Sequence, residues 1–178
     1  MRVLAGRYKS KLIRTINDPL TRPMMSRVRE SIFNSLQFNI VNKDILDLYA
    51  GSGSLGIESL SRDANFVTFI ENSDDCITIL KQNLKEFENN YKITKSSVDK
   101  FLQTSLSTYD IVFYDPPFKI ETDVVKNEVM KIHNILNNDG FVVIHRHTAS
   151  KEFDILKNYK IHKEKNYGQS NILILRKL

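Results

Sequence analysis

Residues 47–56 constrain the fold more than any other part of this sequence. They read as a short apolar strand that runs into a turn and then opens a helix, with glycines at positions 51, 53 and 56. Gly51 and Gly53 allow positive φ angles and remove Cβ atoms that would block a ligand. The N–H groups at the start of the helix favour an anionic group. The pattern predicts a parallel α/β sheet with a nucleotide-like cofactor at the carboxyl end of a strand, where Gly56 lets the helix pack closely.

Strand-like and helix-like segments alternate along most of the chain. Apolar runs predict strands at 45–48, 66–70, 91–94, 111–114, 141–144, and near 159–166 and 171–176, the last two joined by a turn at 167–168. Helical spacing predicts helices at 26–36 with Ser26 as N-cap, 53–60, 74–87 after a Ser73 cap, 98–105, 123–136 and 152–157. We expect a hairpin at 2–14, a loop at 16–23 and a turn at 137–140. This alternation predicts an α/β, doubly wound, Rossmann-like sheet, mostly parallel, with a closing antiparallel hairpin.

Composition excludes several classes of protein. The chain has 178 residues, 41% hydrophobic and 26% charged, and we expect a single domain over 1–178. No apolar run approaches the roughly 20 residues of a membrane-spanning helix, and no apolar leader follows Met1, so we expect a cytoplasmic protein without a membrane partner. Cys76 is the only cysteine, which excludes a disulfide framework and a thiolate metal cluster. We expect no metal.

The positive charge is concentrated near the N-terminus. Residues 1–30 hold eight Lys and Arg against two acids, or +6, whereas the rest of the chain holds 18 against 19, or −1. The basic residues of this segment are Arg2, Arg7, Lys9, Lys11, Arg14, Arg22, Arg27 and Arg29. Such localised charge favours contact with a polyanion, so we interpret 1–40 as a basic extension for nucleic acid and 41–178 as a catalytic core. The alternative is a solvated basic face without a partner.

Glu71 follows the next expected strand, 20 residues after Gly51. A carboxylate at this position is suited to bind the hydroxyl groups of a ribose. The pattern also occurs in dinucleotide-dependent dehydrogenases, and a glycine turn without a ligand is a further interpretation. Two features count against a dehydrogenase. Asp47 lies inside the strand before the turn, and so short a chain has no room for a second nucleotide-binding half.

A second motif, Asp115-Pro116-Pro117-Phe118, follows the buried run 111–114 and is expected at the same sheet edge. The prolines fix φ and remove two backbone donors, so carbonyl oxygens can face a ligand. Asp115 and the Pro116 carbonyl then offer acceptors for both hydrogens of an exocyclic amine on a nucleobase, and Phe118 offers a face for stacking. Two acceptors localise the amine lone pair towards an electrophile, so no strong base or metal is needed. A Pro-Pro turn in which Asp115 only caps the strand is the alternative.

Three basic residues, His145-Arg146-His147, follow the expected strand at 141–144. Two histidines around an arginine make a poor cation site, so a metal is disfavoured. We interpret them as ordinary strand-end residues, with contact to RNA phosphates as the alternative.

These motifs resemble those of a known family. The turn at 47–53, Glu71 and the Asp-Pro-Pro-Phe motif are similar to those of Rossmann-like amino-methyltransferases that use S-adenosylmethionine. Upstream, residues 4–12 and 21–33 are similar to the N-terminal signature of the RsmD family, bacterial methyltransferases of guanine N2 in small-subunit ribosomal RNA. The terminal hairpin around Tyr167-Gly168 also fits, so the resemblance covers nearly the whole chain.

The resemblance implies a sheet of about seven strands, the last antiparallel, and S-adenosylmethionine as cofactor. It implies contacts to the methionine end from Asp47, Gly51 and Gly53, and to the ribose from Glu71. Residues 97–98 stand where the family contacts adenine, although the aspartate often found there comes two residues late, at Asp99. The full set expected to bind the cofactor is Asp47, Tyr49, Gly51, Ser52, Gly53, Glu71, Asn72, Ser97, Val98 and Asp115.

By the same resemblance, the acceptor is N2 of an unpaired or flipped guanine in 16S ribosomal RNA, free or within an assembling small subunit. Asp115 and Pro116 would bind the amine, Pro117 would stiffen the turn and Phe118 would stack on the base. Contacts to the RNA backbone are expected from Arg7, Lys9, Lys11, Arg22, Arg27 and Arg29. Of these, Arg27 and Arg29 could instead brace the fold.

Two positions depart from the family pattern. Residues 24–26 are Met-Met-Ser where the family usually has Thr-Thr-Asp, which removes a hydroxyl contact, and basic residues at 145–147 stand where acids are usual. Alternative acceptors for the same motif are adenine N6 in nucleic acid and a protein glutamine amide. A non-catalytic RNA-binding module is a more distant alternative, because Gly51, Gly53, Glu71 and Asp115 are all present.

Overall fold

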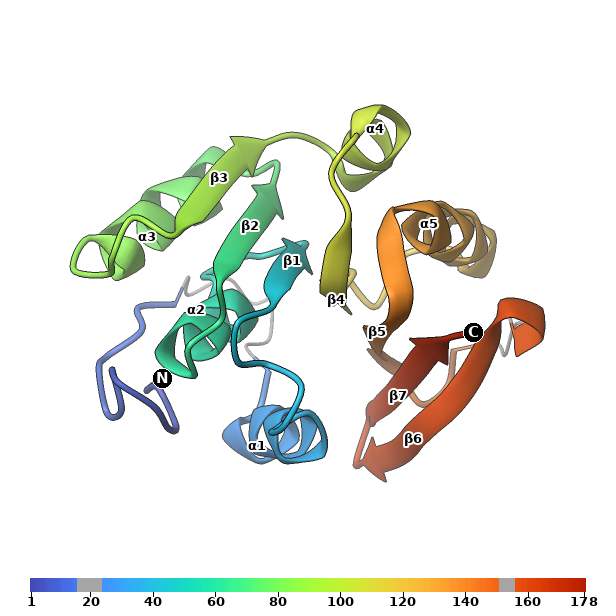
Figure 1. The fold of residues 1–178 in the computed structure, drawn as a ribbon, viewed down its shortest axis with the longest axis horizontal. Helices are drawn as coiled ribbons and strands as arrows, with labels where there is room; N and C mark the ends of the chain where they lie inside the picture. Colours follow the sequence, from blue (N-terminus) through green and yellow to red (C-terminus); the bar gives the residue numbers. More distant parts are fainter. Residues whose placement is uncertain (16–23, 151–155) are drawn as a thin grey trace.

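A seven-stranded sheet forms the centre of the protein, shown in Figure 1 as a computed structural model that describes residues 1–15, 24–150 and 156–178. The strands are β1 (Asp44–Leu48), β2 (Phe66–Glu71), β3 (Tyr91–Lys95), β4 (Tyr109–Tyr114), β5 (Leu136–His147), β6 (Tyr159–Tyr167) and β7 (Ser170–Lys177). Their order in the sheet is β3-β2-β1-β4-β5-β7-β6. Strands β1 to β5 pair in parallel, and β7 runs antiparallel to both β5 and β6. The expected mostly parallel sheet with a closing antiparallel hairpin is confirmed.

Helices cover both faces of this sheet. They are α1 (Ser26–Ser35), α2 (Ser54–Ser61), α3 (Asp74–Leu84), α4 (Val98–Thr104) and α5 (Thr122–Ile135), with a short 3-10 helix at Leu156–Asn158. Apolar side chains of α1, α2 and α3 pack on one face, and those of α4 and α5 pack on the other (Figure 1). In β1, Ile45 faces the first group, whereas Leu46 and Leu48 face the second, as the two-residue period of a strand requires. None of the helices in the described ranges is long and apolar enough to cross a membrane.

Most differences from the expected elements lie at their ends. Ser73 caps α3 as expected, since its Oγ accepts a hydrogen bond from the Cys76 N–H at 3.3 Å. Ser26 is not the N-cap of α1, because it is already the first helical residue, and Met25 stands at the cap without a side-chain hydrogen bond. The expected turn at 137–140 is part of β5, where Asp139 adopts a φ of 62° and the pairing with β4 continues through a register shift. The register pairs Leu136 with Tyr109 and Phe141 with Ile111, so the expected turn residues form an irregularity inside the strand.

The N-terminal segment doubles back as the expected hairpin, although its pairing is short: the N–H groups of Val3 and Ile13 donate to the carbonyl oxygens of Lys11 and Met1 at 3.0 and 2.8 Å. A single antiparallel bridge joins Arg2 and Leu12. The N–H groups of Leu4 and Ala5 donate instead to the Glu58 carboxylate of α2, at 2.8 and 3.1 Å. Residues 1–3 therefore pair with residues 10–13 of the same segment, and the part next to the turn is anchored to α2. The expected loop at 16–23, and residues 151–155 of the expected helix at 152–157, lie outside the described residues.

Candidate active site

Four neighbouring strands end side by side at the carboxyl edge of the sheet. Leu48 of β1 pairs with Ile70 of β2 and with Tyr114 of β4, and Tyr114 pairs with Ile144 of β5. The residues that come next therefore lie in one row, which contains Glu71, Tyr49, Asp115 and His145. The glycine turn and the Asp-Pro-Pro-Phe turn are thus adjacent, at the edge where parallel sheets bind their ligands.

The Glu71 carboxylate holds the glycine turn in place. Its Oε2 accepts a hydrogen bond from the Gly51 N–H at 2.8 Å, and its Oε1 accepts from the N–H groups of Asn72 and Ser73 at 2.8 and 2.9 Å. These bonds fix the carboxylate between the turn and the start of α3. Because each carboxylate oxygen has two lone pairs and Oε1 already accepts two hydrogen bonds, Oε2 keeps one lone pair that can accept from a ribose hydroxyl group.

The three glycines of the turn have different physical roles. Gly51 has a φ of +55°. If it carried a Cβ, the nearest described atom, leaving out its two chain neighbours, would be the Tyr49 carbonyl oxygen at 4.0 Å. A Cβ on Gly53 would lie 2.3 Å from Leu80 Cδ1, and one on Gly56 would lie 2.2 Å from Phe69 Cε1. Gly56 therefore allows the close packing of α2 on the sheet that the sequence predicts. The clearance predicted for both turn glycines is present only at Gly51, because α3 fills the space beside Gly53.

Asp47 lies beneath the glycine turn. Its side chain is buried, and its Oδ2 accepts a hydrogen bond from the Gly56 N–H in the first turn of α2, at 2.9 Å. Burial raises the pKa of Asp47 well above its usual range, the Gly56 hydrogen bond opposes this, and the charges of Asp115 and Glu71 reinforce it. The carboxyl group therefore ties β1 to α2, and its contact with a ligand stays a prediction.

The Asp47→Asn variant should gain stability relative to the wild type as pH rises. A carboxyl group with a raised folded-state pKa stabilises the fold fully below its unfolded pKa, and this contribution is lost as pH rises towards the folded value. Asparagine still offers an oxygen to the Gly56 N–H but does not titrate. Urea unfolding between about pH 4 and pH 8 should show a free-energy difference that shifts in favour of the variant. Asp75→Asn, at an exposed position of α3, is the matched control, and a pH-independent difference for Asp47→Asn would contradict the assignment.

A buried carboxylate on α5 joins the two turns from below. Glu128 is 2% exposed and accepts hydrogen bonds from the Tyr49 hydroxyl at 3.0 and 3.1 Å and from the Tyr114 hydroxyl at 2.6 Å. Tyr49 begins the glycine turn with a φ of 58°, and Tyr114 directly precedes Asp115. Burial is the main cause of the raised pKa of Glu128 and of both tyrosines. These hydrogen bonds link the start of the glycine turn to the start of the Asp-Pro-Pro-Phe turn. The sequence did not predict them, because Glu128 occupies an ordinary helical position.

Asp115 lies in the row with its side chain 31% exposed. Its Oδ1 is 2.7 Å from His145 Nδ1, and His145 Nε2 is 2.9 Å from Ser170 Oγ. His145 itself is buried. The interpretation of His145 as an ordinary strand-end residue is therefore wrong. The signal that could have found it is the parallel pairing of β4 and β5, which puts the residues after Tyr114 and Ile144 side by side.

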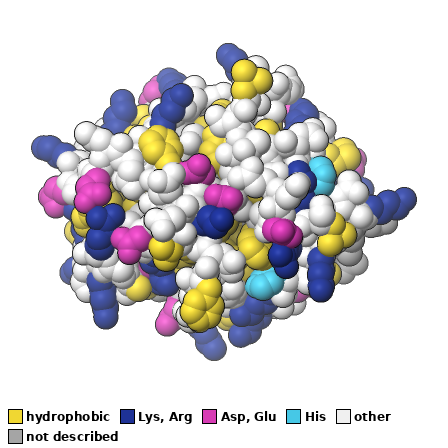
Figure 2. Space-filling view, in the orientation of Figure 1, with side chains coloured by type: hydrophobic (Ala, Val, Ile, Leu, Met, Phe, Trp, Pro, Cys, Tyr) yellow, Lys and Arg dark blue, Asp and Glu magenta, His cyan; other side chains and the backbone are white. Residues whose placement is uncertain are grey.

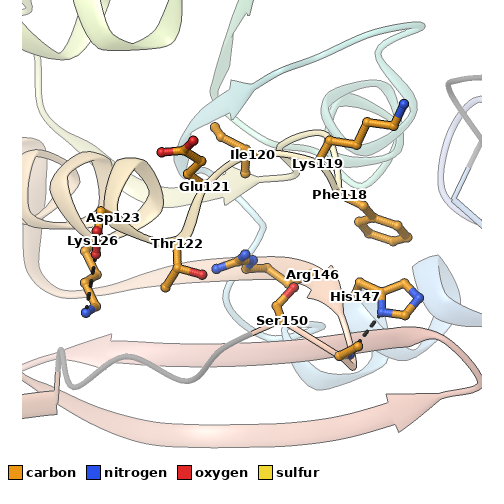
Figure 3. A pocket seen from close by; sticks show the side chains of 11 residues that line it. Phe118, Lys119, Ile120, Glu121, Thr122, Asp123, Lys126, Arg146, His147 and Ser150 are labelled. Carbon is orange, nitrogen blue, oxygen red and sulfur yellow. Dashed lines mark hydrogen bonds and ion pairs between the residues drawn. The ribbon is translucent and has the colours of Figure 1, made fainter.

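The rest of the motif forms a turn beside a cavity. Pro116 is buried, whereas Pro117 and Phe118 are exposed. The Phe118 ring meets the rings of His145 and His147 edge-on, with centroids 5.2 and 5.4 Å apart. Beyond it lies a cavity of about 750 Å³, into which Figure 3 shows the Arg146 guanidinium directed. Residues that line the cavity include Phe118, Thr122, Lys126, Arg146, His147 and Ser150.

The remaining residues expected to bind the cofactor lie around the same edge. Ser97 is exposed and caps α4, with its Oγ accepting from the backbone N–H three residues on at 3.4 Å. Val98 is buried in the core below, and Asp99 is bound by a lysine and a glutamine at 2.5 and 2.6 Å. Ser52 is half-buried and Asn72 is exposed. Ser97, Ser52 and Asn72 can thus be reached by a ligand, whereas Val98 offers little surface.

The basic N-terminal residues are partly neutralised by the rest of the protein. Arg7 pairs with two acidic side chains at 2.7 and 2.9 Å, and Lys11 pairs with one at 2.6 Å. Lys9 and Arg27 are exposed, whereas Arg22 lies outside the described residues. On the face shown in Figure 2, Lys and Arg side chains are spread out, with acidic side chains between them. The described structure therefore favours Lys9 and Arg27 over Arg7 and Lys11 as contacts for a polyanion.

Arg29 does not fit the predicted contact with RNA. Its side chain is fully buried, its Nη2 donates to the Arg2 carbonyl oxygen, and its Nη1 lies 3.1 Å from Met1 Sδ. Burial lowers the pKa of the Arg29 guanidinium. The residue braces the N-terminal segment against α1, which is the alternative stated from the sequence.

Arg29→Ala and Arg27→Ala should separate stability from contact with RNA. The first removes a large buried side chain and a hydrogen bond to Arg2, and we expect it to lower the free energy of unfolding by about 2–4 kcal/mol. The second changes an exposed position, so we expect less than about 0.5 kcal/mol of lost stability but weaker RNA binding, because a positive charge is removed. Urea unfolding and filter binding of both variants check this. Equal stability of the two variants would contradict the bracing role.

Both the sequence and the fold are similar to those of known proteins. Residues 1–176 match the family model described as conserved hypothetical protein 95. Ribosomal RNA small subunit methyltransferase D of Buchnera aphidicola is 32% identical, with 94% of this chain and 88% of that protein covered. The protein of the same name from Escherichia coli is 30% identical, with 95% and 86% covered. A putative methyltransferase from Escherichia coli has a solved structure with a TM-score of 0.88 and 28% identity, covering 99% of this chain and 97% of that chain.

Proposed function

The chain belongs to the conserved hypothetical protein 95 family, the RsmD family of ribosomal RNA methyltransferases, and on this premise we propose that it methylates N2 of a guanine in 16S ribosomal RNA with S-adenosylmethionine as donor. The observation that carries the proposal is the register of β1 and β4. It puts the residues after Leu48 and Tyr114 next to each other, so that a methyl donor and an amine acceptor can meet between the two turns.

The glycine turn fits the cofactor. Glu71 is fixed at the edge, with one lone pair of Oε2 left for a ribose hydroxyl, and Gly51 leaves open space where a Cβ would stand. The exposed Ser97 lies at the end of the neighbouring strand, on the side where the adenine would lie. When bound, S-adenosylmethionine supplies a methyl group on a positively charged sulfur. The chain's own contribution is to hold this methyl group towards Asp115.

The Asp-Pro-Pro-Phe turn fits an exocyclic amine. Asp115 Oδ and the Pro116 carbonyl would accept the two amine hydrogens, which directs the nitrogen lone pair at the methyl group. Phe118 would stack on the base, a contact worth about 1–3 kcal/mol. The amine nitrogen would attack the methyl carbon in line with the carbon–sulfur bond. Positioning of the two reactants in this way can supply a large part of the rate enhancement. The new nitrogen–carbon bond would form as the carbon–sulfur bond breaks, leaving S-adenosylhomocysteine. The nitrogen would then be positively charged and acidic, and it would give its proton to water.

The substrate class rests on the relatives and on charge. The two curated relatives are named for the ribosomal RNA of the small subunit. In this chain the net positive charge resides in residues 1–30, and Lys9 and Arg27 are exposed there. Both features support RNA, free or within an assembling small subunit, over a glutamine side chain of a protein. Adenine N6 is the competing acceptor, because its amine would fit the same two oxygens.

Mass spectrometry of nucleosides from 16S ribosomal RNA tests the acceptor. We expect a strain without the gene to lose one N2-methylguanosine, and the wild-type gene to restore it. Loss of N6-methyladenosine instead, or unchanged N2-methylguanosine, would overturn the proposal. Incubation of the purified protein with free undermethylated RNA and with assembled subunits then identifies the form of the substrate.

A further inference from the structure

His145 lies behind Asp115 and is held on both sides. Its Nδ1 is 2.7 Å from Asp115 Oδ1, and its Nε2 is 2.9 Å from Ser170 Oγ at the start of β7. The His145 side chain is 8% exposed, whereas that of Asp115 is 31% exposed. The imidazole therefore contacts the carboxylate from the protein interior and leaves its outer side open.

The hydrogen-bonding chemistry of Ser170, His145 and Asp115 determines which group donates and which accepts in each contact. An ionised carboxylate only accepts, so His145 Nδ1 must carry the hydrogen that lies between it and Asp115 Oδ1. In a neutral imidazole, Nε2 is then an acceptor, and the Ser170 hydroxyl donates to it. The chain of donors runs from Ser170 through His145 to Asp115. One carboxylate oxygen is thereby occupied, and Oδ2 is left to face a ligand.

The same imidazole also supports the aromatic member of the motif. The Phe118 ring meets the His145 ring edge-on at 5.2 Å between centroids. The buried His145 ring therefore contacts both Asp115, which would accept a hydrogen bond from the amine, and Phe118, which would stack on the base.

We propose that His145 is a positioning residue for methyl transfer. It turns the Asp115 carboxylate so that Oδ2 points at the acceptor amine, and Ser170 holds the imidazole ring in place through the hydrogen bond to Nε2. The inference rests on the proposed function, since it assigns His145 a part in the same site. It does not require His145 to touch the cofactor or the base.

Three substitutions at position 145 separate this role from packing. In His145→Asn the amide nitrogen can stand where Nδ1 stands and donate to Asp115, whereas in His145→Gln it reaches towards Ser170 instead. His145→Leu keeps bulk without a donor. We expect His145→Gln and His145→Leu to lower kcat by about 10- to 100-fold, His145→Asn to retain more activity than either, and the dissociation constant of S-adenosylhomocysteine to stay within a few-fold in all three. His162→Gln, far from this edge on β6, is the control with unchanged kcat.

A second readout does not depend on activity. Nitrogen NMR of the imidazole should show the Nδ1-protonated tautomer of His145 in the wild type. In Ser170→Ala this tautomer should persist, and the Nε2 resonance should shift because its hydrogen bond is lost. An Nε2-protonated tautomer of His145 in the wild type would overturn the inference. So would losses of kcat that follow the decrease in melting temperature among the three variants, with His145→Asn no more active than the other two. If the wild type fails to methylate ribosomal RNA but shows the Nδ1 tautomer, the proposed function fails while the orientation of Asp115 stands.

Discussion

Replacing Asp115 by alanine should abolish methyl transfer and leave the affinity for S-adenosylhomocysteine within a few-fold of the wild type. Asp115 supplies one of the two oxygens that would bind the acceptor amine, and Glu71, on the other side of Tyr49 in the row, carries the expected cofactor contact. Loss of one oriented polar group at a reacting centre costs at least about 100-fold in rate, and loss of the amine's charged acceptor should cost about 1,000-fold or more. Single-turnover transfer and calorimetric binding measure the two quantities separately.

Asp110→Ala is the matched control for Asp115→Ala. Asp110 lies at the opposite end of β4, and its side chain is 26% exposed, close to the 31% of Asp115. Its loss removes a carboxylate of similar exposure from β4, at the end away from Asp115, yet should change kcat by no more than a few-fold. Activity of Asp115→Ala within about 10-fold of the wild type would show that the proposed mechanism is wrong.

Replacing Gly51 by valine should weaken cofactor binding by about 100-fold or more, which corresponds to about 2.7 kcal/mol. The new side chain would fill the open space in front of the turn, where a Cβ at Gly51 has no described atom nearer than 4.0 Å outside its chain neighbours. A positive φ also disfavours a branched side chain, so we expect a loss of stability of at least about 1–2 kcal/mol. Calorimetry with S-adenosylhomocysteine and urea unfolding measure these effects.

Gly53→Ala provides the comparison for the Gly51 variant. Its Cβ would press on Leu80 Cδ1 at 2.3 Å, inside the core, and so it should cost stability by about 1–3 kcal/mol. The folded molecules should nevertheless bind the cofactor within a few-fold of the wild type. If Gly51→Val binds normally and Gly53→Ala does not, the cofactor lies elsewhere than in front of Gly51.

The alternation of strands and helices, and the position of the two motifs at one edge of the sheet, could be predicted from the sequence. Alternating apolar runs and helical stripes predict parallel strands joined by right-handed crossovers, so the turns after 45–48 and 111–114 must lie at one edge. The register then follows from burial, because a slip by one residue would move Asp47 to the other face of β1. The adjacency of Tyr49 and Asp115 depends in addition on the pairing of β1 with β4, which the structure shows and local patterns do not fix.

Contacts between elements distant in sequence could not be predicted in the same way. The Glu128 carboxylate lies on α5 among apolar positions, and only the packed structure shows that Tyr49 and Tyr114 donate to it. The burial of Arg29, in contrast, could have been predicted from the sequence. Arg29 lies three and four residues before the buried Ile32 and Phe33, so it shares the apolar face of α1.

Residues of one type also proved to have different roles. Gly51 and Gly53 both have positive φ and look alike in the motif, yet only the first opens onto free space. His145 and His147 flank one arginine, yet only His145 is buried and bound to Asp115. Side-chain surroundings decide these roles, and they depend on packing that a single sequence pattern does not contain.

A crystal structure of the protein with S-adenosylhomocysteine tests the central claim most directly. We predict that the ribose hydroxyls bind Glu71, that the amino-acid part passes in front of Gly51, and that the sulfur faces the gap beside Asp115 and Pro116. A cofactor bound in the cavity between Phe118 and Arg146, or with its sulfur turned away from Asp115, would contradict the account.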